Sequence, residues 1–296
     1  MPEDELYEKA LQRLNEVALL GTGSIEIKSG YGLSTEGEIK MLRVIKRLKE
    51  SSGLLIKATF LGAHTYPLQY RDDHRGYIDM IKNEMLPAIA KEGLADHIDV
   101  FCEKGFFSPE ETAEVCEAGA RYGLKPKLHV NQLNSIGGIE VGIANDAVSL
   151  DHLETLTEKE IKLLGQYKGC STLLPTAAFF LRMPMQPARA LINGGAAVAL
   201  ASDFNPGSSP SGNMNFVGAL SCIQMKMLPE EVINAATLNG AYAMETQEQS
   251  GSIMIGKRAD IILTKKIPSV AYLFYSFSMN NIDRVMISGR WVEPMK

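Results

Sequence analysis

The sequence of 296 residues lacks the features that mark several specialised classes of protein. Its 4 cysteines are widely spaced with no C-x-x-C pair, which excludes a disulfide framework and a thiolate metal motif. No block of like charge stands out and the net charge is −5, so we expect no nucleic-acid partner. No apolar run has membrane-spanning length, and the acidic residues 1–6 do not resemble a signal peptide. We therefore expect a cytoplasmic protein.

The composition is that of a soluble globular protein, with 45% hydrophobic and 22% charged residues. The length allows one large αβ barrel or two smaller domains. Three of the four cysteines stand in apolar or strand-like segments, which favours buried, reduced thiols.

Strand-like segments alternate with helical patterns along most of the chain. Strands are predicted at residues 24–28, 56–63, 97–102, 126–129, 147–152, 169–174 and 196–201. Helices are predicted at residues 5–20, 34–49, 77–92 and 109–122, between the fourth and fifth strands, and after Thr157. This alternation predicts a parallel sheet, and polar residues at successive strand ends favour a (β/α)8-type TIM barrel. Seven strands are one fewer than a closed barrel requires.

Residues from about 249 onward follow a different pattern. Short strand-like segments with glycine turns occupy residues 251–263 and 284–292, and no helix is predicted between them. We therefore predict an incomplete barrel domain over residues 1–248 and a small C-terminal β appendage over residues 249–296.

The seventh predicted strand is an apolar run of small and branched residues that ends at Asp203. A loop with Asn205, Gly207 and Ser208 follows, offering an amide, backbone N–H groups and a hydroxyl. Ligands of parallel αβ folds bind at the carboxyl ends of strands, so Asp203 is a candidate functional residue. The alternative is an Asp that only caps the turn.

Two of the 5 histidines, His129 and His152, also close predicted strands. With Asp203, His129 forms a partial site for zinc or iron, although two ligands rarely hold a catalytic metal. The sequence contains no H-x-H and no H-E-x-x-H. His152 is a candidate proton carrier or oxyanion partner. The alternative for each histidine is a hydrogen-bonded structural residue near a strand end.

Tyr31 and His64 are candidate ligand-binding residues. Tyr31 stands between two glycines that allow close backbone approach, although the same glycines could form only a tight turn. His64 ends the second predicted strand and could bind an anionic group. Neither remaining histidine is a candidate, because His74 lies in a charged loop and His97 begins a strand.

Five separated motifs at predicted strand ends resemble the imidazolonepropionase family of the amidohydrolase superfamily. The motifs are KSGYGL at residues 28–33, FLGAH at 60–64, KLH at 127–129 with Gln132 and two following glycines, DHLE at 151–154, and ASDFNPGS at 201–208. The tail at residues 251–261 is similar to the composite β domain of amidohydrolases.

This resemblance implies hydrolysis of the ring amide of 4-imidazolone-5-propanoate to N-formimidoyl-L-glutamate in histidine degradation. It implies that His129 and Asp203 bind one divalent metal ion, zinc or iron, and that Asp203, His152 and Gln132 make up the catalytic group. Gln132 would hydrogen-bond the substrate ring, because an amide cannot act as a general acid at neutral pH. The implied substrate-binding residues are Tyr31, His64, Gln132, Asn205, Gly207 and Ser208. A homodimer acting on a small molecule is also implied.

The sequence departs from the family pattern in its N-terminal part. The family's first barrel strand carries an H-x-H pair and a substrate-binding Arg, and the resemblance places Met1 after that strand. We therefore expect a barrel without its first strand, two sheet edges without partners, and exposed apolar residues such as Ile261, Ile262 and Val285.

Two alternatives to this enzyme remain. One is a catalytically silent, amidohydrolase-like fragment that binds a ligand weakly or assembles with another chain. The other is a related cyclic amidohydrolase or deaminase with the same His and Asp framework. Tyr31 and the loop of residues 205–208 favour the propanoate substrate over a nucleobase.

Overall fold

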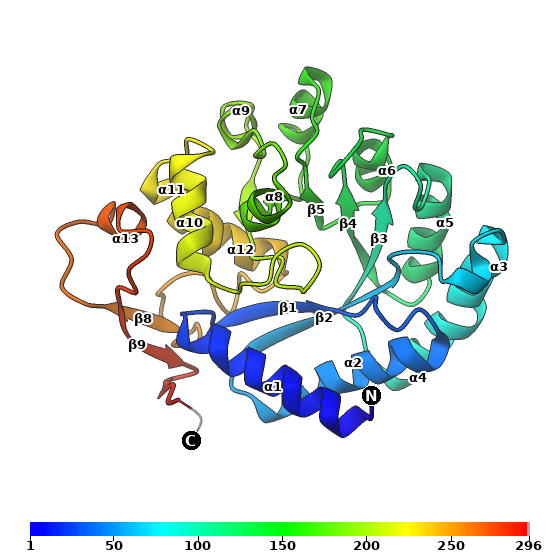
Figure 1. Cartoon of the computed structure of the whole chain (residues 1–296), viewed down its shortest axis with the longest axis horizontal. Helices are drawn as coiled ribbons and strands as arrows, with labels where there is room; N and C mark the ends of the chain where they lie inside the picture. Colours follow the sequence, from blue (N-terminus) through cyan, green and yellow to red (C-terminus); the bar gives the residue numbers. More distant parts are fainter. Residues whose placement is uncertain (295–296) are drawn as a thin grey trace. The chain divides into compact units, whose positions relative to one another are not determined.

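Seven strands form the main sheet of the computed structural model, which describes residues 1–294 (Figure 1). Their order in the sheet follows the sequence from β1 to β7, so β1 and β7 are its end strands. The strands are β1 Ser24–Lys28, β2 Leu55–Ala63, β3 His97–Cys102, β4 Lys125–Val130, β5 Ser149–His152, β6 Cys170–Leu173 and β7 Val198–Leu200. The registers of β2 with β3, β3 with β4 and β6 with β7 are parallel. The predicted parallel sheet is confirmed.

Helices connect the strands, as the alternating pattern predicts. They are α1 Glu3–Leu19, α2 Thr35–Ser51, η1 Leu68–Tyr70, α3 His74–Met80, η2 Ile81–Met85, α4 Leu86–Glu92, α5 Pro109–Ala120, α6 Gly138–Ala144, α7 Glu158–Leu164, α8 Pro175–Leu181, α9 Ala188–Asn193, α10 Met214–Ile223, α11 Pro229–Ala236 and α12 Leu238–Ala243. Within residues 1–294, none of these helices combines the length and the apolar character needed to cross a membrane.

Side-chain caps set the starts of several helices. Ser34 caps α2 by accepting from the Gly37 N–H, and Thr157 forms a capping box with Glu160 at the start of α7. The single helix predicted over residues 77–92 is instead α3, the π-helical turn η2 and α4 in succession. The prediction that His74 lies in a loop is wrong, because Asp73 caps α3 and His74 is its first residue.

Contacts between Cα atoms divide the chain into two compact units. Unit 1 comprises residues 1–11, 25–52 and 56–151. Its core includes β3, in which every residue is buried, together with Phe60 and Leu128 on the neighbouring strands. Helix α5 approaches β3 closely at Gly119, where a Cβ atom would lie 2.8 Å from Cδ1 of Ile98. Strand β3 is therefore buried along its whole length, including the polar residues His97 and Asp99.

Unit 2 comprises residues 12–24, 53–55 and the described chain from His152 onward. Strands β6 and β7 pair in parallel, with Ser171 opposite Val198. Small side chains form a tight core cluster here, namely Cys170, Ala199 and Ala243. These small residues let α12 pack closely on β6 and β7.

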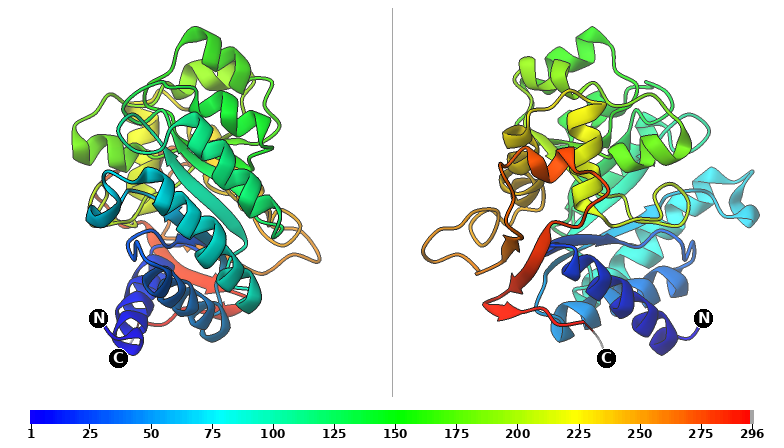
Figure 2. Two further views of the ribbon diagram at one scale, coloured as in Figure 1. Left: turned by 90° about the vertical axis from the view of Figure 1, so that its right-hand side faces the viewer. Right: turned by 60° about the vertical axis from the view of Figure 1, so that its left-hand side comes forward.

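A second, three-stranded antiparallel sheet lies in the C-terminal part of unit 2. Its order is β10 Arg290–Trp291, β9 Ile282–Ile287 and β8 Ile261–Thr264. The predicted C-terminal β strands are confirmed, but the prediction that no helix lies between them is wrong. The four-residue helix α13 Tyr272–Tyr275 joins β8 to β9 and is orange-red in Figure 2. The domain division at residue 248 stays a prediction.

The apolar residues of the C-terminal sheet are exposed only in part. Ile262 is 47% exposed, as expected, and Ile261 is half-buried. The expectation for Val285 is wrong, because its side chain is only 5% exposed. Alternating residues of a strand face opposite sides, so β9 buries Val285 and Ile287 on one face.

The buried cysteines make a prediction about thiol reactivity. Burial raises the pKa of Cys102 to about 11 and that of Cys116 to about 12, and Cys170 is fully buried. Cys222 is only partly buried. Because the thiolate is the reactive form, we expect a disulfide reagent at pH 8 to label native Cys222 alone. Absorbance of the released thiol checks this, with Cys222→Ser as the control. The prediction is contradicted if the buried cysteines of folded Cys222→Ser are labelled faster than the protein unfolds.

Candidate active site

The predicted residues of unit 1 lie at the carboxyl ends of its strands. Tyr31 follows β1, His64 follows β2 and His129 is in β4. The rings of Tyr31 and His64 meet edge to face with centroids 5.3 Å apart, and the His64 and His129 centroids are 6.4 Å apart. Tyr31 is exposed, whereas His129 is buried. The structure thus brings these three side chains together.

A buried carboxylate fixes the loop that carries Tyr31. Glu38 of α2 is fully buried and accepts hydrogen bonds from the backbone N–H groups of Gly30, Gly32 and Leu33, at 2.7–2.9 Å. At Gly32 a Cβ atom would lie 2.3 Å from the carbonyl carbon of Gly37, so this turn requires glycine. The glycines therefore form a tight turn that also presents Tyr31.

A second buried carboxylate fixes the loop that carries Gln132. Glu103, which follows β3, accepts from the backbone N–H groups of Leu133 at 2.8 Å and Asn134 at 3.2 Å. It also accepts from Nδ2 of Asn134 and from the N–H of Lys104. Gln132 itself is half-buried within this loop. The carboxylate thus holds the residues that flank Gln132 on its C-terminal side.

Charged side chains inside the sheet form a network below these loops. Nζ of Lys28 lies 2.7 Å from Oε1 of Glu26, 2.8 Å from Oδ2 of Asp99 and 3.4 Å from Oδ2 of Asp151. Nζ of Lys127 lies 3.3 Å from Oε2 of Glu26. Burial by itself would raise the pKa of Glu26, but Lys127 and Lys28 outweigh it and the net pKa is lowered. Each buried charge therefore has an opposite charge beside it.

Asp99 links this network to His129. Oδ2 of Asp99 lies 2.8 Å from Nδ1 of His129, and Oδ1 accepts the backbone N–H of His129 at 3.1 Å. Burial would raise the pKa of Asp99, but His129 and Lys28 outweigh it and lower the pKa. A carboxylate on one ring nitrogen orients a histidine so that the other nitrogen can bind a metal ion. Nε2 of His129 is therefore its ligand atom for a metal.

In unit 2, His152 is held by a buried carboxylate. Oε1 of Glu154 lies 3.3 Å from Nδ1 of His152 and accepts from Nε2 of Gln186 at 2.8 Å. The backbone turns sharply here, because His152 has φ 85° and Leu153 has φ 64°. Positive φ values are uncommon in non-glycine residues, so two in succession mark a sharp local turn that directs the His152 side chain.

Asp203 lies in the loop after β7, and hydrogen bonds within this loop hold its carboxylate. Oγ of Ser208 donates to Oδ2 of Asp203 at 2.7 Å, and Oδ1 of Asn205 accepts the N–H groups of Gly207 and Ser208. Asp203 also has positive φ, at 50°. The predicted role of Asn205, Gly207 and Ser208 in substrate binding stays a prediction.

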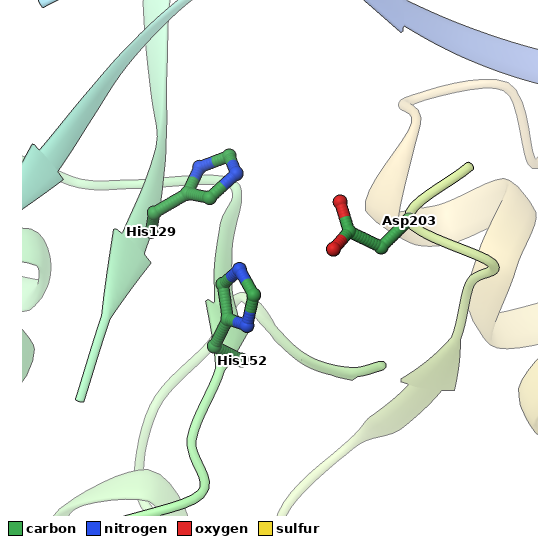
Figure 3. A group of neighbouring side chains, drawn as sticks. All are labelled: His129, His152 and Asp203. Carbon is green, nitrogen blue, oxygen red and sulfur yellow. The ribbon is translucent and has the colours of Figure 1, made fainter. Parts of the chain in front are cut away.

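His152 and Asp203 offer ligand atoms within 4.8 Å of each other in unit 2. Figure 3 shows the elements that carry His129, His152 and Asp203, which are β4, the end of β5 and the loop after β7. Imidazole nitrogen with carboxylate oxygen is a donor set for zinc or iron. Within unit 2, His152 and Asp203 therefore carry donor atoms of the kind that these metal ions accept.

Comparisons with known proteins agree with the sequence motifs. Residues 41–292 match the model of the amidohydrolase family. The imidazolonepropionase of Christiangramia forsetii is 53% identical over 290 residues, which are 98% of this chain and 71% of that protein. That of Flavobacterium johnsoniae is 55% identical over 288 residues, 97% of this chain and 70% of that protein. The chain belongs to the imidazolonepropionase family. The predicted resemblance is confirmed.

Solved structures of other enzymes share the fold. Atrazine chlorohydrolase of Arthrobacter aurescens, complexed with zinc, matches with a TM-score of 0.77 at 14% identity, over 98% of this chain and 72% of that one. An adenosine deaminase from Xanthomonas campestris with bound zinc matches with a TM-score of 0.74 at 18% identity, over 98% and 70%. The predicted barrel fold class is confirmed.

Sequence reasoning assigned no role to several residues that build this imidazolonepropionase-family site. They are Glu26, Lys28, Glu38, Asp99, Glu103, Lys127, Asp151, Glu154 and Gln186. A signal for some was present, because Glu26 and Lys28 stand two residues apart in one strand. Residues at that spacing face the same side of a sheet.

We expect Glu103→Gln to loosen the loop that carries Gln132. The amide carries no charge to match the N–H donors, and hydrogen bonds to charged groups contribute about 1.5–3 kcal/mol each. Urea unfolding should show a loss of about 2 kcal/mol or more, and the Leu133 and Asn134 amides should exchange hydrogen faster. Glu117→Gln on the exposed face of α5 is the control and should change stability by less than about 0.5 kcal/mol. Equal stabilities of the two variants would refute the role of Glu103.

The environment of His64 predicts a pH dependence. Burial lowers its pKa below the usual value of 6.5, and the charge of His129 lowers it further. As the pH falls below about 6.5, His64 is protonated in the unfolded chain before it is protonated in the folded chain. Its protonation therefore lowers the stability of the folded state until the pH reaches the folded pKa of His64. NMR titration of the ring should give a midpoint below 6.5, and His64→Gln should remove this part of the decline. A midpoint at or above 6.5 is incompatible with this.

Proposed function

We propose that the chain hydrolyses the ring amide of 4-imidazolone-5-propanoate to N-formimidoyl-L-glutamate. The observation that carries this proposal is the sequence identity of 52–55%, over at least 97% of the chain, to proteins named imidazolonepropionase. Histidine degradation is the corresponding pathway in the family. Candidate residues at the carboxyl ends of the strands support the proposal, because parallel αβ folds bind their substrates there.

The donor types support one divalent metal ion held by His129 and Asp203. Zinc accepts imidazole nitrogen and carboxylate oxygen as ligands, and this pair supplies one of each. Asp99 on Nδ1 of His129 would orient that ring as a ligand. Zinc in the structures of the two enzymes named above favours zinc over iron. Such an ion, when bound, polarises a carbonyl group and lowers the pKa of water.

Asp203 and His152 have the surroundings that amide hydrolysis needs. The reaction needs a base that takes a proton from water, and a donor that stabilises the negative charge developing on the carbonyl oxygen. Asp203 would be the base, with its carboxylate fixed by the hydroxyl of Ser208. His152, positioned by Glu154, would stabilise the oxyanion or transfer a proton to the leaving nitrogen.

The remaining candidates would bind the substrate. The hydroxyl of Tyr31 and the ring of His64 would contact it from one side, and the amide of Gln132 would hydrogen-bond its ring. Asn205, Gly207 and Ser208 would bind the propanoate carboxylate. Because Oδ1 of Asn205 accepts both N–H groups of this loop, the substrate carboxylate would have to replace that oxygen.

The test combines metal analysis with an assay. The purified chain, loaded with Zn²⁺ or Fe²⁺, should bind about one ion and consume imidazolone propanoate, followed by its ultraviolet absorbance. Asp203→Asn should lower kcat by about 100-fold or more, because general base catalysis contributes about 10²–10⁴. The control is His74→Gln, which changes a half-exposed side chain at the start of α3. A chain without metal and without turnover would establish the silent alternative.

We also propose that the chain is cytoplasmic, as its sequence predicts, and that it forms a homodimer, as the family resemblance implies. Light scattering of the purified chain tests the dimer. A monomer over the whole range of accessible concentrations would exclude it.

A further inference from the structure

A cage of three carboxylates surrounds the ammonium group of Lys28 in unit 1. Oxygen atoms of Glu26, Asp99 and Asp151 lie 2.7, 2.8 and 3.4 Å from Nζ. The side chain of Asp99 is fully buried, and that of Asp151 is 6% exposed. His129 closes the cage, because its Nδ1 lies 2.8 Å from Asp99. Oxygen donors converging on one cationic atom are also how proteins bind metal ions.

We propose that Lys28 occupies a cation site, and that removing its side chain converts the cage into a divalent metal site. The ligands of that site would be Asp99, Asp151 and His129, with Glu26 beside them. His129 would take part through Nδ1 here and through Nε2 for the ion proposed above, so its ring would release the Nδ1 proton to solvent when both ions are bound. The other ligands of the new site belong to unit 1 only. In the natural chain, Lys28 would exclude a metal ion from this position.

The balance of formal charge favours replacement of the Lys28 ammonium group by a divalent ion. Glu26, Asp99 and Asp151 are negative, whereas Lys28 and Lys127 are positive, which leaves one net negative charge. Without Lys28 the cluster has two negative charges in a buried place, and a divalent cation would cancel both. Buried carboxylates without a counter-ion are strongly unfavourable, so the variant cluster should bind a cation from solution.

The geometry also fits a metal ion. Asp99, His129 and Asp151 each offer one ligand atom, and these atoms lie within 4.8 Å of one another. Ligand atoms at about 2.0–2.5 Å from one ion are separated by up to about 5 Å. Two carboxylates with one imidazole suit Mn²⁺, which accepts both oxygen and nitrogen donors and gives an electron paramagnetic resonance signal. Mn²⁺ is therefore the probe.

The experiment compares Mn²⁺ binding by the wild-type chain and Lys28→Ala. The resonance signal of free Mn²⁺ should show one more bound ion per chain in Lys28→Ala. Mn²⁺ should raise the melting temperature of Lys28→Ala more than that of the wild type, because an ion that binds only the folded state stabilises it. The ion count of the wild type tests the proposed function, whereas the increment between the two proteins tests this inference.

Two further variants serve as controls. Lys28→Arg keeps the charge and should bind no additional ion. Lys28→Ala/Asp151→Asn removes one carboxylate of the cage and should lose the additional ion. The inference is wrong if Lys28→Ala binds no more Mn²⁺ than the wild type, or if the double variant keeps the increment. It is equally wrong if Lys28→Ala fails to fold in saturating Mn²⁺ while Lys28→Arg folds.

Discussion

The ion pair between Asp99 and Lys28 is the interaction on which the site of unit 1 depends. An ionised carboxylate loses its hydration when it is buried, so it is stable only beside opposite charge or several donors. Oδ2 of Asp99 contacts both Nζ of Lys28 and Nδ1 of His129, and its Oδ1 accepts the backbone N–H of His129. The position of the histidine ring is therefore a consequence of how this carboxylate is stabilised.

The same constraint shapes the loops above the strands. Glu38 and Glu103 are buried acids whose donors are mostly backbone N–H groups, and these belong to the loops that carry Tyr31 and Gln132. A loop that donates several N–H groups to one fixed carboxylate loses much of its conformational freedom in the folded state. Preorganised loops bind a ligand with a smaller entropic cost than mobile ones. Candidate substrate-binding residues are thus held before any substrate arrives.

Local sequence predicted the strands well because their signal is local. Residues 24–28 and 97–102 form strands with the predicted bounds, since both segments contain β-branched residues that favour strands. The motifs also placed His64, His129, His152 and Asp203 at or just after strand ends. The break at η2 was not predicted, because residues 77–92 keep a helical apolar pattern through the π turn.

Contacts between distant residues could not be predicted in the same way. Glu103 and Leu133 are 30 positions apart, and only the register of β3 against β4 brings their loops together. The buried charges left a weaker signal, since Lys127 and His129 stand two residues apart in β4. A polar pair at that spacing indicates one polar face of the sheet, but it does not reveal which charge meets which.

The choice of a lysine as the cation of this cage has a physical consequence. A metal ion exchanges with solution, so a scaffold that needed one would weaken whenever the ion was lost. Lys28 is the last residue of β1, so its ammonium group is part of the chain. It stays beside Asp99 and Asp151 at any metal concentration. The orientation of His129 therefore does not depend on bound metal, because the ion pair that holds Asp99 is supplied by the chain itself. Unit 1 can thus keep His129 in place whether or not a metal ion is bound.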